Sequence, residues 1–524
     1  MDAGVSFIGG AEGASGTVTV IGTDRAGAPT TWRSYGGLLV GADLGEGFGE
    51  GRIDVLSGGY ALAGVDFNSP VLPTVTFGPK GQVNVSGSIE DVEGVLKPST
   101  FWAGGVLQMS GDMTVSDGGL FVTQGLSELG NTPDDPSVAT IRGSDSAGNA
   151  STWAALGGML IGRFGTAELH IEDGAHVMTG SGAIGSFHSD ADWDAVVNVT
   201  GSNGNGVPSR WEMSGILYAG GTPFGSTGVT GTLNITDGGR VSSSEGWIGV
   251  GGTAPGTVSV RGHDGHGLTS TWDVGGRLRV GVESTGQLAI LDGGIVNSAS
   301  GYVGELNGSS GLVTVSGAGS TWTVTNHLVL GGSGLSNSTT GNGVLTVRDG
   351  GLVDVGGTLK IFPGSTLNGN GTVRGYIENA GLIAPGNSAG TLTLEGNVLS
   401  YPSSMLSIEL GGTGAGQFDV LNVLGSFHAY GELSVSLIDG FHPNGTESFT
   451  ILTAYALTGY FTNAVPAFGD IAASVTFGDL TFDVVYDYAN GRVILTNVVP
   501  EPATLGLMVA GLGLIRRRNR RVAV

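Results

Sequence analysis

Cysteine is absent from all 524 residues, and lysine occurs only three times. The absence of cysteine excludes disulfide bonds, thiol catalysis and cysteine-ligated metal. Charged residues make up 13% of the chain, where about 25% is usual, and the formal net charge is −24. Because phosphate binding needs clustered lysine and arginine, this composition argues against nucleic acid as a partner.

What the chain has instead is glycine, at 101 of 524 positions. Abundant glycine, threonine, valine and serine, with few lysines, favours short strands joined by tight turns over helices. A hydrophobic share of 40% argues against disorder. The first residues, MDAGVSFIGG, lack the basic and apolar segments of a secretory signal peptide. We therefore expect a further segment upstream of this start.

A tryptophan-containing block recurs along the chain. In its five clean copies, the sixth and eighth residues after tryptophan are apolar or small and the ninth is glycine. Because side chains alternate along a strand, the sixth and eighth residues share one face. We predict that the tryptophans form a buried ladder; the alternative is a row of sugar-stacking platforms. The copies are TTWRSYGGLLVG (30–41), STWAALGGMLIG (151–162), SRWEMSGILYAG (209–220), STWDVGGRLRVG (270–281) and STWTVTNHLVLG (320–331), with a degenerate STFWAGGVLQMSG at 99–111.

A second block follows each tryptophan block and reads as an alternating strand that ends in a turn, often Asp-Gly. Its copies are IDVLSGG (53–59), MTVSDGG (113–119), LHIEDGA (169–175), LNITDGG (233–239), LAILDGG (288–294) and LTVRDGG (345–351). Stacked short strands of this kind predict a β-solenoid. With about 20 residues a rung, residues 10–395 predict about 19 rungs and a rod of about 90 Å. A propeller is the rival, but its repeats usually keep one period, and the tryptophan spacings here vary.

These blocks resemble the repeats shared by autotransporter passenger domains and PEP-CTERM proteins, and the segment GNGTVRGYIENAGLIAPGNSAGTLTLEGN (369–397) resembles the passenger region before a β-helix ends. The resemblance implies an all-β fold, a right-handed parallel β-helix over residues 1–395. An autotransporter would end in a translocating barrel of roughly 250 residues or more, whereas residues 396–497 read as an all-β C-terminal cap. The solenoid needs such a cap because an open end exposes unpaired strand edges.

The C-terminal 498–524 reads VVPEPATLGLMVAGLGLIRRRNRRVAV. Its apolar run, 503–515, would span about 20 Å as a helix, which is short for a bilayer core of about 30 Å. A following arginine cluster favours the cytoplasmic side of a membrane. The alternative, a buried core helix, does not explain this order of features. The arginines are Arg516, Arg517, Arg518, Arg520 and Arg521.

Pro500, Glu501 and Pro502, followed by the apolar run and the arginines, resemble the PEP-CTERM sorting signal. That resemblance implies a short transmembrane sorting helix at 503–515. It also implies transient insertion in the inner membrane and cleavage by exosortase, a membrane protease.

The densest polar cluster is GHDGHG (262–267). His263, Asp264 and His266 could in isolation hold a metal. The same slot elsewhere reads GTDRAG, GSDSAG and GSNGNG, so only its third residue, Asp or Asn, persists. An Asx-turn requires that residue. We therefore predict a turn, no metal site and no cofactor.

Paired carboxylates, Asp134 with Asp135 and Asp192 with Asp194, are the groups that a glycosidase would need. No lysine or arginine constellation accompanies them, so we predict no catalytic site. The expected function is an exported structural or adhesive protein of a Gram-negative cell surface, outer membrane or extracellular matrix. By resemblance alone it is linked to exopolysaccharide and biofilm. The alternatives are a polysaccharide lyase or glycosidase on a β-helix scaffold, and a glycan-binding adhesin.

Overall fold

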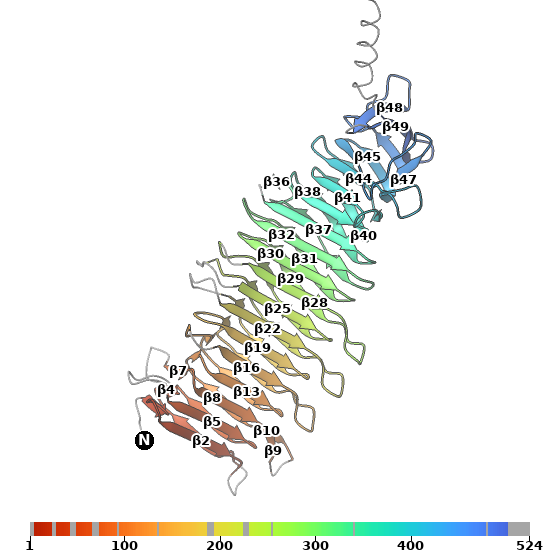
Figure 1. The fold of residues 1–524 in the computed structure, drawn as a ribbon. Coiled ribbons are helices and arrows are strands. Elements are labelled where there is room, and N and C mark those ends of the chain that lie inside the picture. Colours follow the sequence, from red (N-terminus) through yellow and green to blue (C-terminus); the bar gives the residue numbers. More distant parts are fainter. Residues whose placement is uncertain are drawn as a thin grey trace, which may run out of the picture.

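A computed structural model describes residues 5–23, 28–41, 49–64, 73–91, 94–133, 136–185, 193–223, 230–252, 255–338, 341–477 and 480–500. All regular elements in these ranges are β-strands. They stack into one elongated body that runs from β2 near the N-terminus to β49 near the C-terminus (Figure 1). The chain therefore has the all-β, solenoid-like architecture that its repeats predicted.

Three faces of parallel strands enclose the core. Each rung contributes to each face either one strand or one half of a long strand that bends from one face to the next. The first face is a 16-stranded parallel sheet. Its strands are β2 (Ser15–Ile21), β5 (Glu50–Leu56), β8 (Gly81–Ser86), β13 (Asp112–Ser116), β16 (Ser137–Arg142), β19 (Ala167–Glu172), β22 (Asp194–Thr200), β25 (Thr230–Thr236), β28 (Gly256–Arg261), β30 (Thr285–Leu291), β32 (Ser310–Ser316), β37 (Asn342–Arg348), β39 (Thr366–Gly369), β41 (Leu382–Pro385), β44 (Met405–Leu410) and β46 (Glu432–Leu437).

The second and third faces are joined in the later rungs by long strands that bend from one face to the other. These shared strands are β29 (Thr271–Val280), β31 (Ile295–Val303), β38 (Leu352–Ile361), β40 (Thr372–Asn379), β45 (Val420–Ala429) and β47 (Phe449–Gly459). The second face also contains β3 (Thr31–Ser34), β6 (Tyr60–Ala63), β11 (Thr100–Ala103), β14 (Leu120–Thr123), β17 (Thr152–Ala155), β20 (His176–Thr179), β23 (Arg210–Met213), β26 (Arg240–Ser243), β33 (Thr321–Val324) and β42 (Thr391–Glu395). The third contains β1 (Val5–Ile8), β4 (Gly37–Val40), β7 (Thr74–Phe77), β12 (Val106–Met109), β15 (Ser127–Leu129), β18 (Met159–Ile161), β21 (Gly182–Ile184), β24 (Ile216–Ala219), β27 (Glu245–Ile248), β34 (Leu328–Leu330) and β43 (Val398–Ser400).

Two small hairpins project from this body, β9 (Ser88–Glu90) with β10 (Leu96–Pro98) and β35 (Gly332–Gly334) with β36 (Asn337–Ser338). At the C-terminal end, β48 (Ala472–Phe477), β49 (Leu480–Asp487) and β50 (Arg492–Pro500) form an antiparallel sheet with β47. Parallel stacking thus continues beyond residue 395, through β44, β45, β46 and β47. Within the range 396–497, only the part after β47 has a purely antiparallel arrangement.

The sequence repeat of roughly 50–60 residues contains two rungs. On the inner side of the second face, tryptophan and valine alternate from rung to rung: Val177 pairs with Trp211, then Val241, Trp272 and Val296 follow in register. A two-rung unit with tryptophan in every second rung explains why tryptophans recur at this long interval.

The rung count estimated from the sequence is too high. Over residues 10–395, the first face has fourteen strands, from β2 to β41. A rung is longer than the assumed 20 residues because loops such as 262–270 project between its strands. With a strand spacing of about 4.8 Å, the whole 16-stranded face is about 70 Å long.

Glycine on the third face makes room for the indoles of Trp211, Trp272 and Trp322. A Cβ built on Gly246 would lie 2.5 Å from Cζ2 of Trp272, and one on Gly301 would lie 2.8 Å from that of Trp322. Real Cβ atoms do not approach other atoms so closely, so these two positions, each in the rung before the tryptophan, require glycine.

Tight turns connect the first face to the second in the valine rungs. Their aspartates have φ between 51° and 55°, and the glycines that follow have φ between 81° and 91°. Positive φ at both central residues is the type I′ pattern, which Asp-Gly favours. The aspartates are Asp117, Asp173, Asp237, Asp292 and Asp349, so the Asp-Gly turns predicted from the second sequence block are confirmed.

Candidate functional site

The predicted sorting residues begin where the described fold ends. Pro500 is the last residue of β50 and pairs with Leu480 of β49. Glu501, Pro502 and the apolar run 503–515 lie outside the described residues, as do Arg516, Arg517, Arg518, Arg520 and Arg521. Within the described ranges, no helix has the length and apolar character needed to cross a bilayer.

The polar loops that follow the first face in the tryptophan rungs contain the predicted Asx-turns. Oδ1 of Asp264 accepts hydrogen bonds from the backbone N–H groups of His266 and Leu268, at 2.9 and 2.8 Å. Oδ1 of Asn203 accepts two equivalent bonds, each of 3.0 Å. Among the described residues, no group of three or more acidic, histidine or cysteine side chains is placed to hold a metal.

These loops also contact one another along the rod, across the intervening tight turns. Ser202 donates a hydrogen bond to Oδ2 of Asp264, two rungs further on. Ser88 of the β9–β10 hairpin donates one of 3.0 Å to Oδ2 of Asp145. Hydrogen bonding to these carboxylates lowers the pKa of Asp264 and of Asp145, in the latter case against the effect of burial. The aspartates therefore act as structural acceptors.

The tryptophans of the later rungs are enclosed, as the core interpretation predicted. The indole N–H groups of Trp153, Trp272 and Trp322 donate to hydroxyls of the preceding rung, as Trp272 does to Ser243 at 3.2 Å, whereas that of Trp211 has no such partner among the described residues. In the degenerate copy, Phe101 occupies the inward position and Trp102 is only half-buried. Side chains enclosed in the core cannot stack on sugars. The sugar-platform alternative is therefore wrong for the four tryptophans with no exposed surface, Trp153, Trp211, Trp272 and Trp322.

The acidic pairs do not form a site in the described structure. Asp134, Asp135 and Asp192 lie outside the described residues, and Asp194 is an exposed residue at the start of β22. The structure therefore brings no predicted acid–base pair together within the ranges it describes.

An outward-facing row that the sequence reasoning missed runs along the third face. In successive rungs, Tyr218 pairs with Trp247, Trp247 with Arg279, and Arg279 with Tyr302. The rings of Tyr218 and Trp247 meet edge to face at 5.5 Å, and the Arg279 guanidinium lies 4.3 Å from the Trp247 ring centroid. Such stacked contacts stabilise neighbouring rungs; Tyr218 and Trp247 are half-buried, and Tyr302 is buried.

Acidic side chains accompany this row. Arg279 forms an ion pair with Glu305 at 3.4 Å, and Arg277 pairs with Glu245 at 3.2 Å. Glu245 also accepts a 2.8 Å hydrogen bond from the indole of Trp247. Burial raises the pKa of Glu305, although Arg279 opposes that shift. The row is thus an amphipathic surface of paired charges and rings.

The sequence did contain a signal for this row. Tyr218, Trp247 and Tyr302 each lie two residues before a glycine that ends a third-face strand. An aromatic at that outward position, between two inward ones, is visible in the printed sequence once the two-rung repeat is known.

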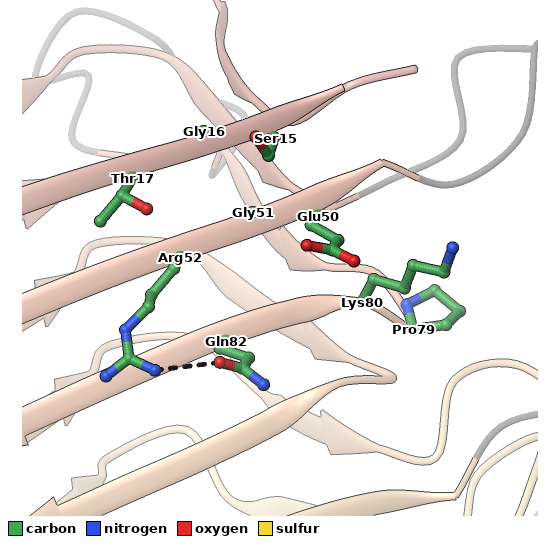
Figure 2. A pocket seen from close by; sticks show the side chains of 9 residues that line it. All are labelled: Ser15, Gly16, Thr17, Glu50, Gly51, Arg52, Pro79, Lys80 and Gln82. Carbon is green, nitrogen blue, oxygen red and sulfur yellow. Dashed lines mark hydrogen bonds between the residues drawn. The ribbon is translucent and has the colours of Figure 1, made fainter. Parts of the chain in front are cut away.

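Two hollows lie on the outer side of the first face. One, of about 430 Å³, lies beside β2, β5 and β8 (Figure 2). There Arg52 donates a 3.1 Å hydrogen bond to Gln82 and forms an ion pair with Asp54 at 2.8 Å. Lys80 and Glu50 complete its charged lining.

The second hollow, of about 230 Å³, is bordered by Asp419 and Glu409. Asp419 is 1% exposed and accepts hydrogen bonds from the backbone N–H groups of Gly390 and Glu409, at 2.9 and 2.8 Å. Burial outweighs these bonds and raises the pKa of Asp419 to about 7. With each carboxyl oxygen engaged, the side chain joins the loop at Gly390 to strand β44.

Comparison of the chain with protein-family models gives no match, and comparison with curated proteins gives no significant match.

Proposed function

We propose that this chain is an exported structural or adhesive rod of a Gram-negative cell surface or extracellular matrix. The observation that carries the proposal is the position of the tail: the Pro-Glu-Pro motif begins at the last residue of β50. Cleavage there would remove the apolar run and the arginines without removing a described strand. A stacked β-structure whose sorting tail can be cleaved off is suited to export and surface display.

In this proposal, the solenoid winds as a right-handed parallel β-helix. Residues 503–515 form a short helix that enters the inner membrane transiently, and the arginines that follow remain on its cytoplasmic side. An exosortase-type protease is the processing partner, and exopolysaccharide of a biofilm matrix is the proposed surrounding. The resemblance of the repeats and of the tail supports these assignments.

The test is fractionation of tail variants in the organism that encodes the protein. A variant with Pro500→Ala, Glu501→Ala and Pro502→Ala should accumulate in the membrane fraction at full length, because the protease loses its recognition motif. A control variant, Pro363→Ala with Pro402→Ala, alters two prolines at exposed turn positions and should reach the surface normally. Equal surface display of both variants would refute sorting through this motif.

A glycan-binding adhesin is the second candidate function, and the half-buried rings of Tyr218 and Trp247, with Arg279 beside them, are the observation that favours it. Rings flanked by paired charges suit stacking and hydrogen bonding to a neutral sugar chain. Quenching of Trp247 fluorescence by neutral oligosaccharides, lost in Trp247→Leu, would favour this function over a purely structural one.

A further inference from the structure

A loop with an exposed apolar tip lies at the C-terminal end of the rod, between β47 and β48 (Figure 1). The loop reads FTNAVPAFGDI (461–471), and Asp470 is its only charged residue. Phe468 is fully exposed, and Val465 and Ile471 are 52% and 54% exposed. Large apolar side chains exposed together on one surface commonly mark an interaction site.

The base of this loop is fixed to the fold by Tyr486 of β49. The hydroxyl of Tyr486 accepts a 3.0 Å hydrogen bond from the N–H of Phe461 and donates one of 2.8 Å to the carbonyl of Ala464. Its backbone N–H donates a 2.7 Å bond to the carbonyl of Ile471. Phe461 and Ala464 are buried. Both arms of the loop are thus held by one residue, so the exposure of the tip is a property of the fold.

A tight turn forms the tip itself. The N–H of Asp470 donates a 2.9 Å hydrogen bond to the carbonyl of Ala467, and Gly469 has a φ of 93°. A glycine with positive φ at the third position of such a turn is the type II pattern. Phe468 therefore lies at the apex of an ordered turn.

Half-exposed tyrosines lie beside the base of the loop. Tyr430, Tyr460 and Tyr488 are 39%, 43% and 41% exposed. Tyr430 and Tyr460 follow Ala429 and Gly459, which pair in neighbouring rungs, and the hydroxyl of Tyr488 donates a 2.9 Å hydrogen bond to the carbonyl of Gly459. A ring with a polar hydroxyl suits the boundary between hydrocarbon and water.

The position of the tail identifies the partner. Pro500 pairs with Leu480 of β49, and Tyr486 lies six positions further along the same strand, about 20 Å away. In the proposed function, the apolar run 503–515 enters the inner membrane. Its first residue follows Pro500 by three positions, which span about 10 Å at most. A tail inserted in the membrane therefore keeps this end of the rod close to a bilayer.

The charge of the chain favours lipids without net charge. The formal net charge is −24, and the loop has no lysine or arginine to attract an anionic headgroup. Apolar side chains at the boundary of headgroups and acyl chains bind by burial of their surface. We propose that the rod docks on a lipid bilayer through Val465, Phe468 and Ile471. This inference rests on the proposed function, because the sorting tail brings the bilayer, and the docking holds the Pro-Glu-Pro motif at the membrane surface.

A fluorescent label on the loop tests the docking in the full chain. Because the chain has no cysteine, Ala467→Cys gives one site for an environment-sensitive fluorophore beside Phe468. In vesicles of phosphatidylcholine and phosphatidylethanolamine, its emission should shift to shorter wavelength, and lipids with a nitroxide on the acyl chain should quench it. The matched control is Ser244→Cys, an exposed position in the middle of the rod, where the label should remain in water.

Substitution of exposed side chains then tests which of them carry the docking. Adding Val465→Ser and Phe468→Ser to Ala467→Cys should abolish the quenching, because the loop loses the apolar surface that it buries. Adding Tyr455→Ser instead, which removes an 87% exposed ring from β47, should leave the quenching unchanged. Raising the salt concentration should also leave it unchanged, because apolar burial is not a charge interaction that salt screens.

The outcomes separate the docking from the proposed function. Quenching that requires Val465 and Phe468 in a chain bound to vesicles supports the docking. A vesicle-bound chain whose label at position 467 remains in water, or whose quenching survives both serine substitutions, overturns the docking and leaves insertion of the tail intact. A full chain that stays in solution overturns the membrane role of the tail and the docking with it.

Discussion

Single residues explain why the two-rung repeat is so regular. The buried indoles of Trp211, Trp272 and Trp322 each need a glycine in the preceding rung, and each tight turn needs a neighbour to satisfy its backbone. Buried serines supply that neighbour: Ser270 accepts a 3.0 Å hydrogen bond from the N–H of Gly238 and donates one of 2.7 Å to the carbonyl of Arg261. Equivalent serines at Ser151, Ser209 and Ser320 hold the turns of their own preceding rungs. Neighbouring rungs are therefore joined by specific contacts as well as by apolar packing.

The first prediction concerns the space beneath the indole. Gly246→Ala should lower the free energy of unfolding by about 1–3 kcal/mol, because the added methyl overpacks the core against Trp272. Gly252→Ala is the control, since a Cβ there meets no atom within 4 Å. Thermal unfolding followed by circular dichroism measures both variants. An unchanged melting temperature in Gly246→Ala would contradict the packing argument.

The second prediction concerns the serine that joins two rungs. Ser270→Ala should cost about 1–3 kcal/mol, because the buried N–H of Gly238 loses its acceptor. Ser244→Ala, at an exposed position of the second face edge, should leave stability unchanged. Urea denaturation of the two variants measures the difference, and equal midpoints would show that the hydrogen bond contributes nothing.

The third prediction concerns pH. Because the folded pKa of Asp419 is raised to about 7, above about 3.9 in the unfolded chain, the folded state binds the proton more tightly. Its contribution to stability is complete below pH 4 and is lost as pH rises through 7. The melting temperature of the native chain should therefore fall more between pH 5 and pH 8 than that of Asp419→Asn. Parallel pH profiles for the two proteins would contradict this assignment.

At the scale of elements, the sequence predicted much but not the length of a rung. Strand alternation and Asp-Gly turns were readable because period-2 patterns and turn chemistry are local. The pairing of a tryptophan rung with a valine rung was not, because the register between strands far apart in sequence depends on packing. The outward row from Tyr218 to Tyr302 was missed for the same reason.

The two-rung unit makes an element-scale prediction. Deleting residues 201–261 removes two rungs and should preserve the fold, because Trp272 then stacks on Val177 and occupies the space at Gly182. Deleting residues 201–236 removes one rung, places two valine rungs side by side and leaves a cavity at Gly182. We expect a melting temperature near that of the native chain for the first deletion and a much lower one for the second. Equal loss in both would contradict a two-rung repeat.

At the scale of the whole molecule, a stacked rod precedes the C-terminal tail, which we propose is a sorting signal. The antiparallel sheet of β47 to β50 covers one end, and the chain leaves that sheet at Pro500. The rod is long and regular, and the side chains on its inner side pack neighbouring rungs against one another. Surface display of such a rod is the central claim.

The most direct test is the mass of the native protein's C-terminus, measured in surface and membrane fractions of the source organism. A surface product that ends near Pro500–Pro502 is the predicted result, and it would establish both export and removal of the tail. An intact chain ending at Val524, found only in the soluble cytoplasmic fraction, would contradict the sorting claim and leave the stacked β-fold without an assigned location.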